Sequence, residues 1–172
     1  MPNFFAKTAK ISPLADIETS IRGSILSIGE NSVIDSFVKI KFTGGKGDIV
    51  IGDVCYINSG CVFYSGNGIQ IGQKVSVAAN CVFAPVNHAY TNDEIPIRDQ
   101  GFSASKGGIN IEEDVWIGSG CVILDGAVIR KGAVIAAMSL VRGEIEAHST
   151  HAGKNNALLF QSVADTETLD QT

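Results

Sequence analysis

The sequence predicts an all-β chain folded as one single-stranded parallel β-helix of hexapeptide repeats. The first observation is a six-residue beat, because aliphatic residues recur at every sixth position from Ile111 to Val141. The second is that a small or apolar residue follows each of them four positions later, as Cys121 follows Ile117. A period of six fits neither an α-helix nor the two-residue alternation of an ordinary strand. It fits short strands that bury their apolar side only when successive turns of the chain stack.

Three hexads would make one triangular coil of about 18 residues, and successive coils would stack about 4.8 Å apart. The aliphatic residue of each hexad then points inward from a flat side, and the small residue fills a corner. An ordinary β-sandwich is the alternative, but it would bring irregular turn spacing and two-residue alternation.

The repeats divide the chain into regions. The first ten residues read as a short docking arm, the beat is loose from Ile11, and it is clear from Ile28. Equivalent positions Ile28, Ile51, Ile71 and Ile111 are separated by 23, 20 and 40 residues, so a long insertion lies in the last interval. Insertions in stacked repeats form loops, commonly on the binding face. We expect a β-helix domain over 1–154 with an extruded loop at 85–108, and a C-terminal cap and mobile tail over 155–172.

Composition excludes several classes of function. The formal net charge of -5 argues against a nucleic-acid partner, because such binding depends on neutralising phosphates with Lys and Arg. No apolar run is long enough to cross a membrane, so membrane insertion is not expected. The N-terminal residues lack the apolar segment of a signal peptide, which favours a cytoplasmic location.

The four cysteines all occupy the small corner position of a hexad. No CxxC pair is present, so a zinc site is not indicated. We expect them to be buried core residues in a reducing compartment; they are Cys55, Cys61, Cys81 and Cys121.

The predicted loop carries the most reactive side chain in the body of the chain. His88 is the only histidine before the C-terminal region, and it lies beside Asn87 and Tyr90. Asp93 and Glu94 follow shortly after. A long loop without regular structure is usually functional or disordered, and the Pro, Ile and Phe residues in this one argue against disorder.

The repeat pattern, the histidine-bearing loop and the segment DVWIGSGCVI that follows it resemble the hexapeptide acyltransferases. The resemblance covers roughly residues 25 to 155. It is greatest to the maltose, galactoside and xenobiotic O-acetyltransferases and to the O-acetyltransferases of surface polysaccharide biosynthesis. This implies a left-handed β-helix and a homotrimer whose active sites lie between neighbouring prisms. It also implies transfer of an acetyl group from acetyl-CoA to a hydroxyl of a saccharide or related small acceptor, with no metal required.

His88 matches the general base of that family. Imidazole titrates near neutral pH, so it could take the acceptor's proton and later return it to the leaving thiolate. Asp93 and Glu94 are candidates for the group that fixes its tautomer. The alternative is a surface-loop histidine with no catalytic role.

Three positions match the family's coenzyme-binding residues, and two basic residues are candidates for contacts to the coenzyme phosphates. Trp116 matches an aromatic near the coenzyme, or else a rim residue that packs on a neighbouring subunit. Ser119 matches a residue of the pantetheine channel whose backbone amide helps the thioester oxygen, and Ala137 matches a backbone contact to pantetheine. The family's closing G-N-P-A-[KR] element has lost its proline and its terminal basic residue in this chain, so Arg142 or Lys154 would have to meet the phosphates.

Three positions are candidates for binding the acceptor. Tyr56 and Asn58, one coil before the loop, match acceptor-contacting residues, and Asn58 is the stronger of the two although Asn is also common in turns. Asn87 adjoins the candidate base.

Three other functions remain open. A γ-type carbonic anhydrase uses the same prism with a metal held by three histidines, but His148 and His151 lie close together near the C-terminus, without repeat-registered spacing. An N-acetyltransferase of an amino sugar is a second alternative. A trimeric scaffold without catalytic activity is the third.

Overall fold

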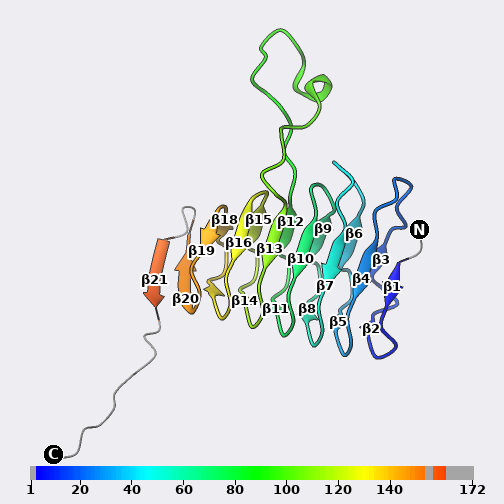
Figure 1. Ribbon diagram of the computed structural model, residues 1–172, viewed down its shortest axis with the longest axis vertical. Coiled ribbons are helices and arrows are strands. Elements are labelled where there is room, and N and C mark those ends of the chain that lie inside the picture. The colour runs from blue at the N-terminus through cyan, green and yellow to red at the C-terminus, as the bar shows by residue number, and fades with distance from the viewer. Residues whose placement is uncertain (1–2, 154–156, 162–172) are drawn as a thin grey trace, which may run out of the picture.

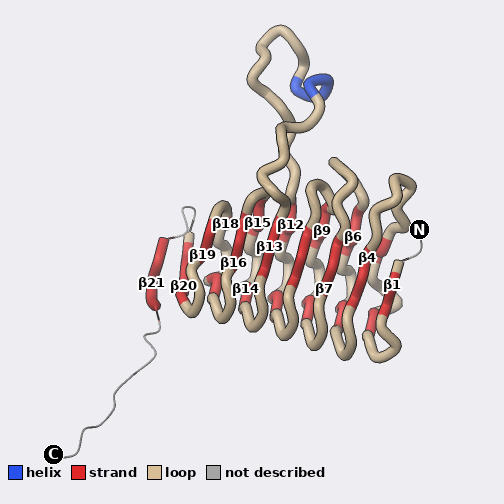
Figure 2. Tube along the Cα trace, in the orientation of Figure 1, coloured by secondary structure: helices blue, strands red, loops and turns tan. Residues whose placement is uncertain are grey.

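The computed structural model describes residues 3–153 and 157–161, and its elements are short strands plus one turn of 3-10 helix (Figures 1 and 2). The strands stack into three sheets that form the sides of an elongated prism, and the ladders of β1 to β20 are parallel. The first sheet, A, contains β1 (Phe4–Phe5), β4 (Leu26–Ile28), β7 (Ile49–Ile51), β10 (Ile69–Ile71), β13 (Ile109–Ile111), β16 (Ala127–Ile129) and β19 (Glu144–Ile145). Sheet B contains β2 (Lys10–Ile11), β5 (Val33–Ile34), β8 (Tyr56–Ile57), β11 (Ser76–Val77), β14 (Trp116–Ile117), β17 (Val134–Ile135), β20 (Ser149–Ala152) and β21 (Ala157–Gln161). Sheet C contains β3 (Asp16–Ile17), β6 (Lys39–Lys41), β9 (Val62–Tyr64), β12 (Val82–Ala84), β15 (Val122–Leu124) and β18 (Leu140–Val141).

The six-residue beat becomes a set of inward-facing files, as predicted. In sheet A, Ile71 lies opposite Ile111, and Ile111 lies opposite Ile129, so equivalent residues of successive coils are in register. These residues are at most 3% exposed. In sheet C the file contains two aromatic residues, Phe63 and Phe83, whose rings stack with centroids 4.3 Å apart. The core is therefore one continuous apolar column along the prism.

The corners explain the small residues and the turn residues. All four cysteines are free thiols and buried, as predicted, and the file Cys61, Cys81 and Cys121 runs under the corner between sheets B and C. Many of the corners also contain a residue in the left-handed backbone conformation. Asn80 has a φ of 61° at the corner between sheets B and C, whereas the corner between sheets A and B places the β-branched Val54 at 58°.

The first coil begins earlier than the sequence indicated. Phe4 and Phe5 form β1 and pair with β4, so the predicted docking arm is part of the prism. Phe5, Ile11 and Ile17 are spaced by six, and the phenylalanine in the first aliphatic position hid the repeat.

The long insertion leaves the prism between β12 and β13, at the corner between sheets C and A, and projects away from the body (Figure 1). It contains the only helical element of the described chain, the 3-10 turn η1 (Ile97–Gln100). At the other end, β21 pairs antiparallel with β20. Residues 154–156 and 162–172 lie outside the described residues, so the predicted boundary at 154/155 and the mobile tail stay predictions. Within the described residues no helix is long and apolar enough to cross a membrane.

Candidate active site

The two strands of chain at the base of the long loop, residues 87–89 and 101–103, form a neck that positions His88. The chain leaves β12, and His88 forms an isolated antiparallel bridge with Phe102 on the returning segment. The Ser103 N–H donates to the Asn87 carbonyl at 2.8 Å, and the Ser103 hydroxyl donates to the His88 carbonyl at 3.1 Å. These bonds fix the backbone on both sides of the histidine, while its side chain stays exposed at the surface.

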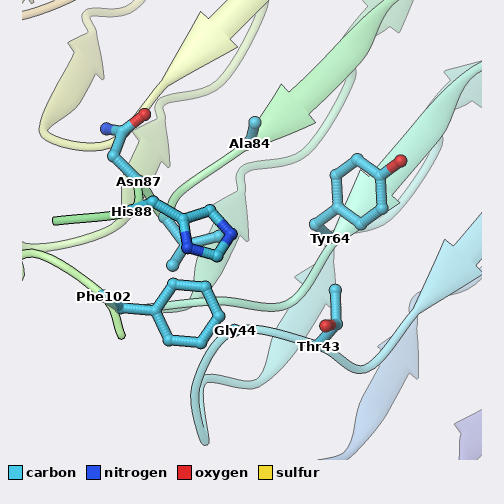
Figure 3. Close-up of a pocket in the computed structure, with 8 residues that line it drawn as sticks. Thr43, Gly44, Tyr64, Ala84, Asn87, His88 and Phe102 are labelled. Atoms are coloured by element: carbon cyan, nitrogen blue, oxygen red, sulfur yellow. The ribbon is translucent and has the colours of Figure 1, made fainter. Parts of the chain in front are cut away.

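One side of the His88 ring faces a mostly apolar cavity of about 330 Å³ (Figure 3). The Phe102 ring lies against the imidazole with centroids 4.8 Å apart and planes tilted by 40°. Tyr64 and Thr43 supply the hydroxyl groups of its lining. The lining residues are Thr43, Gly44, Tyr64, Ala84, Val86, Asn87, His88 and Phe102.

A second cavity, of about 400 Å³, adjoins the same histidine and is more polar. Lys106 and Asp125 lie in its lining together with Tyr90 and Ser103. His88 and Asn87 line both cavities, so the imidazole lies at the border between an apolar space and a polar one.

Sequence reasoning missed several of these residues. Asp93 and Glu94 line a separate cavity in the outer part of the loop, and neither lines a cavity with His88, so the group that orients the imidazole stays a prediction. They lie near His88 in sequence, but the loop continues outward past the neck and carries them away from it. Phe102 could have been found only by knowing that the loop folds back on itself.

The predicted aromatic positions share one face. Tyr56 and Trp116 both lie on the outer face of sheet B and both pair with Ser76, which lies between them in the ladder. Their side chains are 45% and 55% exposed.

Other predicted residues gather at the corner between sheets B and C. Ser119 and Ala137 are exposed there on successive coils, and the Met138 N–H donates to the Ser119 carbonyl at 2.9 Å. Asn58 occupies the same corner, but its side-chain amide donates to the Val77 carbonyl at 2.8 Å, which is a turn-stabilising role. Arg142 is exposed just after β18, and Lys154 lies outside the described residues.

Within one chain, His88 does not lie near the predicted coenzyme-binding residues Ser119 and Ala137. His88 leaves the corner between sheets C and A, whereas Ser119 and Ala137 lie at the corner between sheets B and C. A whole side of the prism separates them, on the order of 15–20 Å for six residues of extended chain.

The histidines also fail to form a metal-binding group. His151 is buried in β20, where its ring bonds the Ser149 hydroxyl at 2.9 Å, while His88 lies on the extruded loop. No group of three His, Cys, Asp or Glu side chains in the described part of the chain could hold a metal ion.

Part of the repeat region matches a known protein family. Residues 108–143 match the model of the bacterial transferase hexapeptide family, described as six repeats. This part of the chain therefore carries the hexapeptide repeats of that family. Its fold is accordingly the left-handed parallel β-helix that the resemblance implied.

The proteins that the chain resembles have different functions. The chain is 30% identical to the galactoside O-acetyltransferase of Lactococcus lactis over 82% of its own length and 65% of that protein's. It is 32% identical to γ carbonic anhydrase 1 of Arabidopsis thaliana mitochondria over 91% of its length and 53% of that protein's. The chain spans about half to two thirds of the length of these and other curated relatives that it matches.

Two solved structures are similar over most of the chain. The hexapeptide-repeat acetyltransferase VCA0836 of Vibrio cholerae, complexed with acetyl coenzyme A, is 27% identical with a TM-score of 0.69, covering 78% of this chain and 69% of that one. AntD, an N-acyltransferase of Bacillus cereus in complex with dTDP and 3-hydroxybutyryl-CoA, is 21% identical with a TM-score of 0.76, covering 94% of this chain and 83% of that one.

Proposed function

We propose that the protein transfers an acetyl group from acetyl-CoA to a hydroxyl of a saccharide or related small acceptor, with His88 as general base. The observation that carries the proposal is the position of His88 on a backbone-fixed neck, exposed between two cavities. The similarity to a galactoside O-acetyltransferase and to an acetyltransferase that binds acetyl-CoA supports the choice of donor and acceptor.

The proposed reaction needs one proton carrier. The His88 imidazole takes the proton of the acceptor hydroxyl as that oxygen attacks the thioester carbonyl carbon. The tetrahedral intermediate then collapses, the carbon–sulfur bond breaks, and the imidazolium returns the proton to the thiolate. The products are the acetyl ester and free CoA thiol. Acetyl-CoA is a co-substrate here, and the mechanism requires no metal.

The apolar cavity beside His88 is the proposed acceptor site. Its Tyr64 and Phe102 rings offer aromatic surface for the C–H face of a sugar ring, while the Thr43 and Tyr64 hydroxyls and Asn87 offer polar contacts. Tyr56 and Asn58 are proposed to approach the acceptor from a neighbouring copy of the chain.

We propose a homotrimer because the site is incomplete in one chain. The coenzyme positions Trp116, Ser119 and Ala137 lie a prism side away from His88, so a second copy must supply them. A closed ring of three prisms would place each loop against the next copy, since heterologous interfaces close into rings. Arg142 and Lys154 are the proposed contacts to the coenzyme phosphates. Sedimentation analysis of the purified chain tests the trimer.

A cytoplasmic location is part of the proposal. Four buried free thiols suit a reducing compartment, and a donor such as acetyl-CoA must be available where the protein works.

The test is a thiol-release assay with acetyl-CoA and a panel of hydroxyl acceptors, each matched by an amino sugar. Release with a hydroxyl acceptor that is lost in His88→Ala supports the proposal. The control is Asp99→Ala, at an exposed loop residue that lines neither cavity beside His88. Release only with amino sugars would replace it with N-acetylation, the second candidate, which the likeness to AntD favours. A flat trace with every acceptor and no binding of coenzyme would replace it with a scaffold.

A further inference from the structure

Asp125 is a buried carboxylate that the proposed chemistry does not use. It is 6% exposed and lies in the turn after β15, at the corner between sheets C and A. This is the corner from which the long loop leaves, one coil earlier in the chain. A carboxylate at that depth needs hydrogen-bond donors around it, because burying an unsatisfied charge is costly.

Every donor to Asp125 comes from the base of the loop or from the coil before it. One carboxylate oxygen accepts the Gly108 N–H at 2.9 Å, and the other accepts the Lys106 N–H at 2.8 Å. The second oxygen also accepts the Asn67 side-chain amide at 3.1 Å. The returning end of the loop is therefore held by two backbone bonds to one side chain.

Asn67 bonds the other end of the loop, where the chain leaves the prism. Its backbone N–H donates to the carbonyl of Pro85, where the loop begins, at 3.1 Å. Asn67 and Asp125 are 58 residues apart in sequence. They lie at the same corner of the prism, in the coils just before and just after the loop, and their side chains bond to each other past the point where the loop leaves. Together they bond both ends of the insertion.

Gly108 fits the same arrangement. It has a φ of 81°, and a Cβ there would lie 2.6 Å from the Gly68 carbonyl oxygen, so only glycine allows the returning chain to approach so closely. The approach aligns its N–H with Asp125.

We infer that Asn67 and Asp125 form a clamp that sets the position of His88, and that both are positioning residues for the proposed acetyl transfer. The inference rests on that proposed function only for its effect on rate. The neck that carries His88 bonds to itself between Asn87 and Ser103, but Lys106 and Pro85 are the points at which it joins the rigid prism. Releasing the clamp frees the neck to tilt as a unit, and displacing a catalytic group by about 1 Å can lower the rate about 100-fold.

The test variant is Asp125→Asn, which keeps the shape of the side chain. Its amide has one oxygen for three donors and turns an NH2 group toward at least one of them, so at least one bond to the loop is lost. The matched control is Asp48→Asn. Asp48 lies at the same type of corner and accepts the Ile25 N–H at 2.9 Å, without a bond to the long loop. Asn67→Ala is the second variant, in case Asp125→Asn does not fold.

Two readouts are combined on the full-length protein. The kcat of Asp125→Asn and Asn67→Ala should fall about 10- to 100-fold while the KM for acetyl-CoA changes less than about twofold, because the coenzyme positions lie on another corner. Hydrogen exchange at the neck amides of Ala89 and Ser103 should quicken at least about tenfold while exchange in β13 to β17 is unchanged. Asp48→Asn should match the wild type in both.

The inference is overturned if a folded clamp variant keeps kcat and neck exchange within about twofold of wild type, or if exchange rises equally in all coils. If no variant, wild type included, transfers acetyl to any acceptor, the proposed function fails, and the exchange data alone decide whether the clamp exists.

Discussion

Replacing Phe83 by leucine should destabilise the prism by about 2 kcal/mol. Phe83 is fully buried in β12, the strand that leads into the loop, and its ring stacks on Phe63 of the preceding coil with planes 5° apart. Leucine fills less of the space, which costs about 1 kcal/mol for a void of methyl size. Losing an aromatic pair costs a further 0.5–1.5 kcal/mol, approximately.

The pair also predicts coupling. Once Phe63 is leucine, the stack is already lost, so Phe83→Leu should then cost about 1 kcal/mol less than in the wild type. Urea unfolding of the wild type, both single variants and the double variant gives this coupling energy, at one protein concentration because assembly makes stability concentration-dependent. Strictly additive changes, or a Phe83→Leu cost below about 0.5 kcal/mol, would refute the reasoning that the stack stabilises the core.

Three more predictions concern the corners and the surface. Val54→Asn should raise the free energy of unfolding by about 0.5–1 kcal/mol in urea titrations, because Val54 is half exposed and its φ of 58° suits asparagine better than a β-branched residue. The pKa of Glu112 is lowered by the hydrogen bond from Arg130 and by the bond from the Lys131 N–H. The bond between Arg130 and Glu112 therefore stabilises the fold at pH values above the pKa of Glu112 in the unfolded chain, and this stabilisation is lost as the pH falls through the pKa in the folded protein. Arg130→Gln should therefore lose less stability than wild type between about pH 5 and pH 3 in thermal melts, and equal losses would contradict this. A hydrogen bond from the Cys121 thiol lowers the pKa of Cys81, but the bond that the Cys81 thiol donates to Cys61 and its burial outweigh this and raise the pKa to about 11. Cys81 should therefore resist a thiol reagent until the protein unfolds, and rapid labelling of the native protein would contradict that.

The sequence predicted the prism because its core is periodic. Residues six apart lie on neighbouring sides of the prism, and each stacks on its equivalent in the next coil, so Ile111 and Ile117 specify their own environment. The same repeat predicts the buried cysteines, which occupy the small corner position of their hexads. The first coil escaped detection because Phe5 stands where an aliphatic residue was expected, and packing tolerated the larger ring at the end of the column.

The site could be predicted only in part, because it depends on how a non-repeating loop folds. His88 was singled out because it is the lone histidine of a long insertion, and its role as general base stays a prediction. Phe102 and Asp125 were not found, since the first depends on the loop returning to its own start and the second on a corner one coil away. Asp93 and Glu94 lie near His88 in sequence, but they line a separate cavity of the loop.

The central claim is that His88 of one chain works with the Ser119 and Ala137 corner of another. Co-expressing His88→Ala with Ala137→Trp, each inactive alone, tests it directly by thiol release from purified mixed assemblies. Random mixing in a ring of three should restore about a quarter of the wild-type sites, because only interfaces with both intact halves are active. The control partner is the double variant His88→Ala/Ala137→Trp, which should restore nothing when mixed with Ala137→Trp or with His88→Ala. Mixed assemblies no more active than their parents would contradict a site shared between neighbouring chains.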